Sequence, residues 1–346
     1  MTAPSPRQLT AAFSRLSEAS AAALLATSHG IAAAHIERLA TERDDSFCVD
    51  TERGSLVAKF AHPLDDPRSL LDQVTVLETL WHDHADLPVQ RVLPGLDGEL
   101  VHRVIDDAGQ ARSVRVLSYL DGELLGARTR SLADLHALGS FHARFASAVA
   151  SIGDADPTLT GSETAWNLTQ FELYAPRADD LADGPLRNDV LRVLDGARRT
   201  VLPRLDTLPA VLAHNDLHGD NVLVSAEPFA VTGVLDFGDM TRTPRVADLA
   251  VAASYARGRA PSTVEPWGAA KAYVAGFAAV QPLTDDERAL LPELVLLRLA
   301  QRGILNSAIA AANPAAADYA SRNLSAIARD LRELSASIPS TIGAPA

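Results

Sequence analysis

The spacing of apolar residues predicts a strand-rich first third of the chain. Short apolar runs alternate with polar breaks in this part, which is typical of strands. We expect a helix that ends at Gly30, followed by strands over 31–40, 47–51, 55–61, 87–94, 98–106 and 113–120. Between the third and the fourth of these strands, apolar residues recur at helical spacing after Pro67, which predicts a helix to about His82.

From residue 124 onward the spacing is mostly that of amphipathic helices. Helices are expected over 131–150, 165–175, 188–205 and nearly all of the chain after Val246. A strand-rich patch at 210–237 is the exception. The predicted fold is therefore α+β and bilobal, and 346 residues suffice for two cores. We expect a β-rich lobe over 1–118, a hinge at 119–123 and a mainly helical lobe over 124–346.

The strand-rich patch contains a polar loop, "HNDLHGDN", over residues 214–221. A surface turn, a histidine metal site and a catalytic loop are the three possible interpretations. A three-histidine site is disfavoured because His82, His84, His136 and His142 lie on other predicted elements. If 221–225 and 231–236 pair as a hairpin about residues 228–229, Asn221 lies opposite Asp236. Amide and carboxylate oxygens of this kind suit Mg²⁺ held jointly with phosphates, whereas zinc prefers nitrogen and sulfur.

The spacing of the loop favours phosphoryl transfer. His214, Asp216 and Asn221 match the pattern H-x-D-x-x-x-x-N, and "LDFG" follows at 235–238. Asp216 is then the candidate catalytic residue, which orients a hydroxyl and accepts its proton. Asn221 and Asp236 are the candidate Mg²⁺ ligands. We expect a structural role for His214, and for Asp248 a role in bracing the loop.

Charge and composition narrow the class of partner. The net charge of −13 argues against nucleic acid, whose phosphates would be repelled. A single cysteine, Cys48, is consistent with a reducing compartment. The apolar stretch at 19–35 is too short and too interrupted for a membrane span, so we expect a cytoplasmic protein without a membrane partner.

Lysine is rare in this chain, which makes one position informative. Only Lys59 and Lys271 are lysines among the 31 basic residues. Lys59 falls on the predicted strand over 55–61, where a kinase requires a lysine for the phosphates of the nucleotide. A carboxylate of the following helix should orient it, and we expect Glu78, with Asp72 as the alternative.

These motifs together resemble the aminoglycoside phosphotransferase and choline kinase branch of the kinase-like fold, and within it the hydroxylysine kinase group. The similar stretches lie between about residues 20 and 310, and they include "TERDDSF", "LVAKFAHPLDDP", "LPVQRVLPGLDGE", "HNDLHGDNVLV" and "GVLDFGDM". At "WNL" (166–168) and at His218-Gly219, relatives often have other residues. These two differences bear mainly on the predicted acceptor pocket.

The resemblance implies a nucleotide site that replaces the missing glycine-rich loop. In it, Ser46 and Phe47 cover the phosphates, and backbone groups over Ser118–Leu120 bind the purine. ATP and GTP both remain candidates for the nucleotide. The short segment after Asp236 argues against a protein kinase, and the complete motif set argues against a non-catalytic pseudokinase.

The resemblance also implies a small hydroxylated acceptor with an amine, bound by the helical lobe. His218, Asp239 and Trp166 are candidate acceptor contacts, and Asp220 is a further acid for the amine. A carboxylate on the acceptor would need an arginine, and Arg245, Arg298 and Arg302 are the candidates by position. A hydroxylysine-like amino acid is expected, with an aminoglycoside as the alternative, on a monomer or homodimer.

Overall fold

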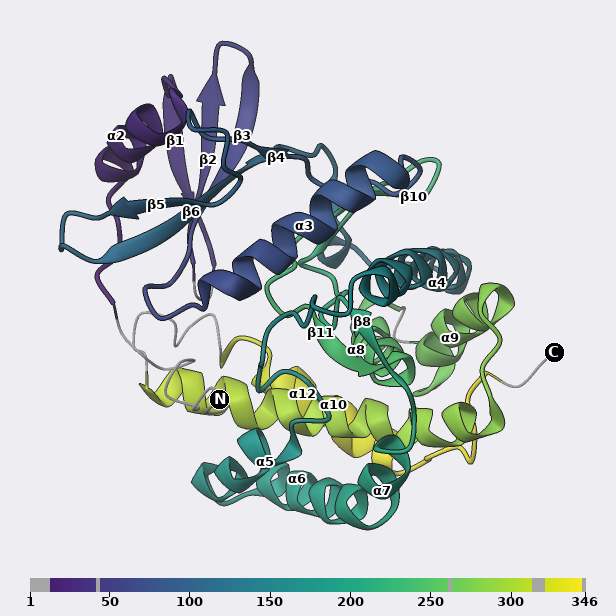
Figure 1. The fold of residues 1–346 in the computed structure, drawn as a ribbon. Coiled ribbons are helices and arrows are strands. Elements are labelled where there is room, and N and C mark those ends of the chain that lie inside the picture. The colour runs from purple at the N-terminus through teal and green to yellow at the C-terminus, as the bar shows by residue number, and fades with distance from the viewer. Residues whose placement is uncertain (1–12, 42–43, 261–262, 313–320, 344–346) are drawn as a thin grey trace. The chain divides into compact units, whose positions relative to one another are not determined.

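The computed structural model describes residues 13–41, 44–260, 263–312 and 321–343. The chain divides into two compact units, over residues 11–121 and 122–346. The first unit is rich in strands and the second is mainly helical (Figure 1).

The N-terminal unit is built on one antiparallel sheet. Its elements are α2 (Glu18–His29), β1 (His35–Leu39), β2 (Asp45–Thr51), β3 (Gly54–Phe60), α3 (Pro67–Asp83), β4 (Val92–Leu93), β5 (His102–Ile105) and β6 (Ala111–Ser118). The strand order is β1-β2-β3-β6-β4, with β5 paired to the far end of β6. The helix α2 ends at Gly30, whose φ of 65° is the left-handed conformation that glycine adopts without strain.

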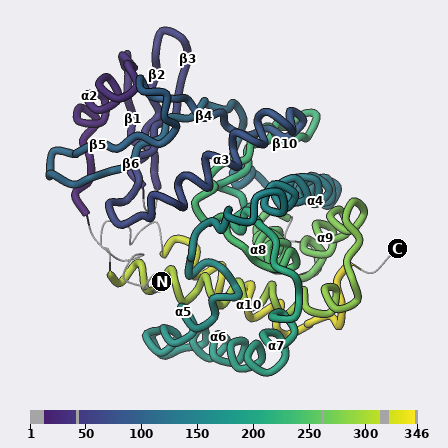
Figure 2. Tube along the Cα trace, viewed as in Figure 1, coloured from purple at the N-terminus to yellow at the C-terminus, as the bar shows by residue number. Residues whose placement is uncertain are grey.

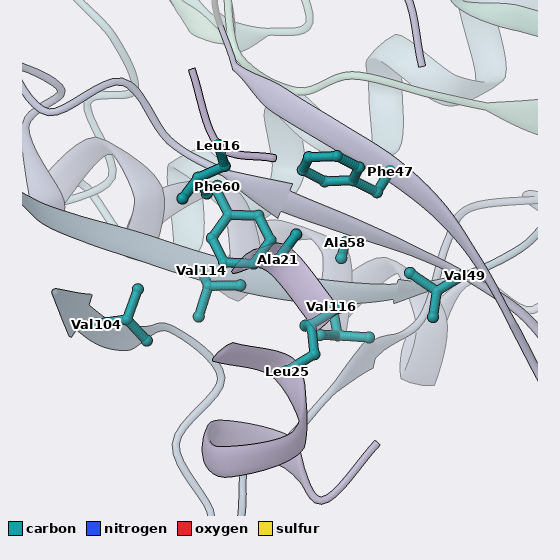
Figure 3. Close-up of a cluster of buried hydrophobic side chains, with 10 residues drawn as sticks. All are labelled: Leu16, Ala21, Leu25, Phe47, Val49, Ala58, Phe60, Val104, Val114 and Val116. Atoms are coloured by element: carbon teal, nitrogen blue, oxygen red, sulfur yellow. The ribbon is translucent and has the colours of Figure 1, made fainter. Parts of the chain in front are cut away.

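One face of this sheet carries the core of the unit. Phe47, Phe60 and Val116 point into it together with residues of α2, as Figure 3 shows. The rings of Phe47 and Phe60 pack edge to face with their centroids 5.9 Å apart. Residues paired directly across antiparallel strands share a face, so the alternate residues of β2, β3 and β6 lie on the opposite face.

The C-terminal unit holds the predicted loop and most of the helices. Its strands are β7 (Glu123–Leu124), β8 (Ala210–Ala213), β9 (Val222–Ser225), β10 (Ala230–Val234) and β11 (Thr241–Pro244). Its longer helices are α4 (Leu132–Ala155), α6 (Pro185–Gly196), α8 (Arg245–Ala256), α9 (Gly268–Val280), α10 (Asp285–Ala312) and α12 (Leu324–Ser335). Short helical segments are η1 (Leu125–Ala127), α5 (Phe171–Tyr174), η2 (Ala175–Asp180), η3 (Ala197–Val201), α7 (Leu202–Leu205) and η4 (Arg257–Arg259).

Helix pairs in this unit approach closely where glycines permit it. A Cβ at Gly139 of α4 would lie 1.9 Å from the carbonyl oxygen of Tyr273, and one at Gly276 of α9 would lie 1.9 Å from that of His136. The helices α4 and α9 therefore lie side by side, as the trace in Figure 2 shows. Within the described parts of the chain, α10 is the one helix long and apolar enough to cross a bilayer, and 78% of its apolar window is buried inside the protein.

Three sequence-based expectations on local structure were wrong. The strand expected from residue 31 begins only at His35. The helix expected over 165–175 shrinks to Phe171–Tyr174, because side chains in the preceding segment hydrogen-bond to its backbone. The Thr164 hydroxyl accepts a hydrogen bond from Trp166 N, and Asn167 Oδ1 accepts one from Thr169 N. Such local side-chain bonds compete with helix formation.

The third error concerns the hairpin of β9 and β10. Val222 pairs with Val234, and Leu235 N donates to Asn221 O at 2.8 Å, so Asn221 lies opposite Leu235 instead of Asp236. Next to the turn Ser225 pairs with Ala230, so the hairpin is centred between residues 227 and 228 instead of about residues 228–229. A bulge between Val231 and Gly233 moves the register by one residue toward the expected pairing but does not reach it. The strand β11, which pairs with β8, was not predicted.

Candidate active site

The loop over 214–221 runs from β8 to β9 and is anchored from below by Asp248 of α8. Asp248 Oδ1 accepts a hydrogen bond from Asn215 N at 2.7 Å, and Oδ2 lies 2.8 Å from His142 Nε2. Tyr273 Oη in turn lies 3.0 Å from His142 Nδ1. Asn215 takes a φ of 63°, which turns the chain sharply just before Asp216. The network holds the loop from a buried base, as expected for Asp248.

His214 packs inside the protein beneath this loop. Its ring contacts the rings of Phe145 and Phe237, with the centroid of Phe237 at 4.9 Å. Its Nδ1 accepts from Asp216 N at 3.3 Å, and its Nε2 lies 3.1 Å from Leu235 O. Burial lowers the pKa of His214, which favours the neutral ring that this pattern requires. His214 therefore ties the loop to the segment that carries Asp236.

Asp216 receives nitrogen contacts on both carboxylate oxygens. Asn221 Nδ2 donates to Oδ2 at 2.7 Å, and Arg298 Nη2 donates to Oδ1 at 3.0 Å. His218 Nε2 lies 3.2 Å from Oδ2. Burial raises the pKa of Asp216, but the charges of His218 and Arg298 outweigh it and hold that pKa below its ordinary value. The side chain is 17% exposed, so an ionised carboxylate remains open to a ligand.

Asn221 and Asp236 have the donor atoms that a magnesium site needs. Asn221 Nδ2 donates to the backbone and to the side chain of Asp216, which leaves Oδ1 as the amide atom for a metal. Asp236 is exposed at a φ of 58°, and its Oδ1 accepts from Gly238 N at 3.1 Å. Two oxygen-bearing side chains with room for phosphates and water fit Mg²⁺. The metal role of both residues stays a prediction.

His218 begins a stack of three planar groups. Its ring lies parallel to that of Tyr255, with centroids 4.5 Å apart and planes inclined by 14°. The guanidinium carbon of Arg302 lies 3.8 Å from the centre of the Tyr255 ring. Burial alone would lower the pKa of His218, but the neighbouring Asp216 charge raises it to about 9. His218 is therefore a cation at neutral pH, in contact with the candidate catalytic residue.

Asp239 follows Asp236 on the same loop and has a different environment. Thr164 Oγ1 donates to its Oδ1 at 2.9 Å. Burial, then the charges of Asp216 and Asp236, raise the pKa of Asp239 to about 7. A cationic group placed beside Asp239 would favour its ionised form. Asp220, the other acid proposed for an amine, already accepts from Arg322 Nη2 at 2.7 Å.

Sequence reasoning missed the role of Arg298. Its side chain is 1% exposed, and it reaches Asp216 from α10 while Nη1 donates to Trp166 O at 2.7 Å. Gln301 accepts from Nη1 at 2.8 Å and donates to Ala165 O at 2.7 Å. The signal was present in the sequence, since an arginine within the apolar run "LVLLRLAQ" must find partners when it is buried. The Arg298 guanidinium lies over the Trp166 ring, with its central carbon 5.1 Å from the ring centre.

In the N-terminal unit, Lys59 belongs to a polar row across three strands. It pairs with Ser46 of β2 and with Arg115 of β6, so the three side chains share the face opposite the core. The Ser46 hydroxyl is buried and has no hydrogen-bond partner among the described residues. Arg115 contacts Gln73 of α3 and lies 3.3 Å from Asp44 Oδ2. This row is where the predicted phosphate contacts of Lys59 and Ser46 meet.

Other predicted nucleotide contacts are constrained by the structure. The Phe47 side chain is fully buried in the core, which leaves only its backbone for a phosphate. Glu78 Oε1 accepts from Val92 N at 3.3 Å, and Oε2 lies 3.7 Å from His82. Asp72 is buried on the same helix. Which of these two carboxylates orients Lys59 stays a prediction.

The segment Ser118–Leu120 is fixed at its first residue. Ser118 N donates to Arg91 O at 2.9 Å, and Ser118 O accepts from Gln90 Nε2 at 2.9 Å. Its hydroxyl oxygen accepts from Arg91 N at 3.0 Å. Ser118 therefore holds the start of the segment in place, because its backbone N–H, its carbonyl and its hydroxyl are already hydrogen-bonded. Purine binding by backbone groups of Ser118–Leu120 stays a prediction, and it suits the backbone of Leu120 better than that of Ser118.

Comparison with known proteins decides the family. A family model described as "Phosphotransferase enzyme family" matches residues 35–283, which is most of the chain. The chain belongs to the phosphotransferase enzyme family. Among curated relatives, the hydroxylysine kinase of Danio rerio is 26% identical to this phosphotransferase over 285 residues, covering 80% of this chain and 79% of the relative. That of Xenopus laevis is 26% identical over 306 residues, covering 83% and 81%.

Solved structures share the fold of this phosphotransferase. An amicoumacin kinase, solved in complex with AMP-PNP, Ca²⁺ and Ami, superposes with a TM-score of 0.69 at 18% identity, covering 94% of this chain and 96% of that one. A microcompartment-associated aminopropanol kinase gives 0.65 at 20% identity, covering 93% and 100%. The predicted α+β kinase-like fold and the kinase class of enzyme are confirmed.

Proposed function

We propose that this kinase transfers the γ-phosphoryl group of ATP or GTP to a hydroxyl of an amine-bearing acceptor, and that the acceptor is an amino acid like 5-hydroxylysine. The observation that carries the proposal is Asp216, an ionised and partly exposed carboxylate fixed by three nitrogen contacts. The similarity to hydroxylysine kinases over four-fifths of the chain supports the choice of acceptor.

In the proposed reaction, Asp216 accepts a hydrogen bond from the acceptor hydroxyl. The hydroxyl oxygen forms a bond to the γ-phosphorus, the bond from that phosphorus to the β,γ-bridging oxygen breaks, and the nucleoside diphosphate leaves. The proton of the hydroxyl passes to the Asp216 carboxylate. The depressed pKa of Asp216 makes it a weak base, so its main contribution is to orient the hydroxyl.

Asn221 and Asp236 are the residues that would hold Mg²⁺. When bound, the metal supplies positive charge against the phosphate oxygens. In the N-terminal unit, Lys59 is the residue proposed to contact the phosphates of the nucleotide, and its place in the row with Ser46 and Arg115 supports this role.

The acceptor amine is proposed to bind near Asp239. This carboxyl group has the Thr164 hydroxyl as its neighbour and a pKa raised to about 7, so an ammonium group would supply the missing positive charge. Asp220 is less suitable because Arg322 already neutralises it. An aminoglycoside also carries amines and hydroxyls and is therefore the alternative acceptor.

A coupled assay of nucleotide consumption tests the proposal. Hydroxy amino acids, amino alcohols and aminoglycosides are screened with ATP and with GTP in the presence of Mg²⁺. We expect turnover with 5-hydroxylysine and weaker turnover with amino alcohols. Turnover with aminoglycosides alone would replace the first choice by the alternative, and turnover with neutral sugars alone would refute both acceptors.

A further inference from the structure

Arg302, on helix α10, has no acidic partner among the residues that the structure describes. Its guanidinium lies over the Tyr255 ring at 3.8 Å and forms no hydrogen bond or ion pair with the residues that the structure describes. The side chain is half-buried on α10, four residues after Arg298, so both arginines project from one side of the helix. A guanidinium removed from water without an acceptor is costly unless a ligand supplies one.

The two other arginines proposed from the sequence for a carboxylate are already committed. Arg245 Nη2 and Nε bind both carboxylate oxygens of Glu287, at 2.8 and 2.6 Å. Arg298 donates hydrogen bonds to Asp216, to Trp166 O and to Gln301. Of the three candidates, Arg302 is the one whose whole guanidinium forms no hydrogen bond or ion pair with the described residues.

The stack connects Arg302 to the candidate catalytic residue. Arg302 covers one face of Tyr255, His218 covers the ring as well, and His218 Nε2 lies 3.2 Å from Asp216 Oδ2. The guanidinium carbon is thus at most about 8 Å from the centre of the His218 ring. In 5-hydroxylysine the hydroxyl oxygen and the carboxylate carbon are five bonds apart, which spans roughly 6 Å when extended. One ligand of this size matches the spacing from the Asp216 end of the stack to Arg302.

We propose that Arg302, held flat by Tyr255, binds the carboxylate of the acceptor and thereby selects amino acids over amines that lack a carboxylate. The inference rests on the proposed function, because it names a subsite of the same acceptor pocket. The planar fork of arginine matches a carboxylate with two parallel hydrogen bonds, which lysine cannot reproduce.

Binding of two unreactive ligands tests this subsite without depending on turnover. Lysine and 1,5-diaminopentane differ by the carboxylate, and neither has a hydroxyl to be phosphorylated. Calorimetric titration of the wild type should show lysine binding roughly 10- to 100-fold more tightly, as two charge-assisted hydrogen bonds require. Arg302→Gln should remove this preference by weakening lysine binding alone, and Arg302→Lys should restore only part of it.

Arg288→Gln is the matched control, since Arg288 lies on the same helix and contacts Asp285 at 3.3 Å. It should leave both affinities unchanged, and thermal unfolding should verify that each variant is folded. Equal binding of the two ligands by the wild type, or an equal loss of both in Arg302→Gln, would overturn the carboxylate subsite. Such results would leave the kinase reaction on amine acceptors intact. Failure of the wild type to bind either ligand while it phosphorylates another acceptor class would overturn the proposed acceptor and the subsite together.

Discussion

Asp216 and Asp45 are both aspartates in contact with arginine side chains, but they differ in how much of the carboxylate remains exposed. Asp45, at the start of β2, is 0% exposed and accepts hydrogen bonds from Leu16 N and Arg112 Nη2, both at 3.1 Å, besides its contacts with Arg15 and Arg38. Asp216 is 17% exposed and has one arginine, one histidine and one amide around it.

The pKa values of both acids are lowered against the effect of burial. Burial would raise the pKa of Asp45, but Leu16 N, Arg38 and Arg112 together lower it. Burial would likewise raise the pKa of Asp216, but His218 and Arg298 lower it. The direction of the shift therefore does not separate a structural carboxylate from a reactive one. What separates them is access, because one carboxylate is sealed by four partners from the protein and the other retains a face for a ligand.

The largest effect on folding is expected at the sealed acid. Among the described residues, Asp45→Asn leaves the buried Arg112 with Asp106, 3.5 Å away, as its one remaining charged partner. Breaking a buried ion pair on one side should reduce the free energy of unfolding by about 3–5 kcal/mol. Urea unfolding followed by circular dichroism measures the loss. Asp50→Asn on the same strand, where the Asp50 carboxylate accepts a hydrogen bond from the Ser55 hydroxyl, is the control and should cost less than about 1 kcal/mol.

Arg298→Lys is expected to affect catalysis more than stability. The ammonium group keeps the charge but cannot bind Asp216 and the Trp166 carbonyl in the same geometry, so Asp216 is oriented less well. We expect kcat for the acceptor to fall roughly 10- to 100-fold while the KM for the nucleotide stays within threefold. Steady-state kinetics with each substrate varied measures both values. A kcat within twofold of the wild type would reduce Arg298 to a packing role.

A smaller effect is expected in the pH dependence of stability. The folded pKa of His218 is about 9, above its ordinary 6.5, so the contact with Asp216 stabilises fully below pH 6.5 and is lost as the pH rises to 9. The difference in melting temperature between the wild type and His218→Gln should therefore be largest near pH 6 and narrow by pH 9.5. His35→Gln on β1, where the side chain is exposed, should show no such trend. A constant difference for His218→Gln would show that the ring acts by packing against Tyr255.

The sequence was sufficient for the parts of the site that are local. Asp216, Asn221 and Asp236 are set by short motifs next to strands, and their neighbourhood follows from the hairpin even though its register differs by one residue from the expected one. Arg298 and Tyr255 lie on separate helices, and no local pattern specifies that both face the loop. The partners of Asp45 illustrate the same limit, since Arg112 is 67 residues away and reaches it only through the order of the sheet.

Some errors of the sequence analysis have physical causes that the pattern does not carry. Side-chain bonds of Thr164 and Asn167 replace a helix by a turn that presents Trp166 to Arg298. Ser46 and Phe47 are adjacent but point to opposite faces of the sheet, so one side chain faces the Lys59 row and the other belongs to the core. The resemblance implies phosphate contacts through backbone N–H groups and a side-chain hydroxyl, and the alternation of the strand is consistent with the hydroxyl being that of Ser46; the contacts themselves stay a prediction.

Phosphoryl transfer by Asp216→Asn is the most direct test of the catalytic role of Asp216. It is measured in single turnover with Mg²⁺, nucleotide and an acceptor that the wild type uses. The amide keeps the shape and one accepting oxygen but loses the charge that orients the hydroxyl and takes its proton. We predict a rate at least roughly 100-fold below the wild type, with nucleotide affinity within threefold and the fold intact. A rate within tenfold of the wild type would contradict the assignment of Asp216 as the catalytic residue.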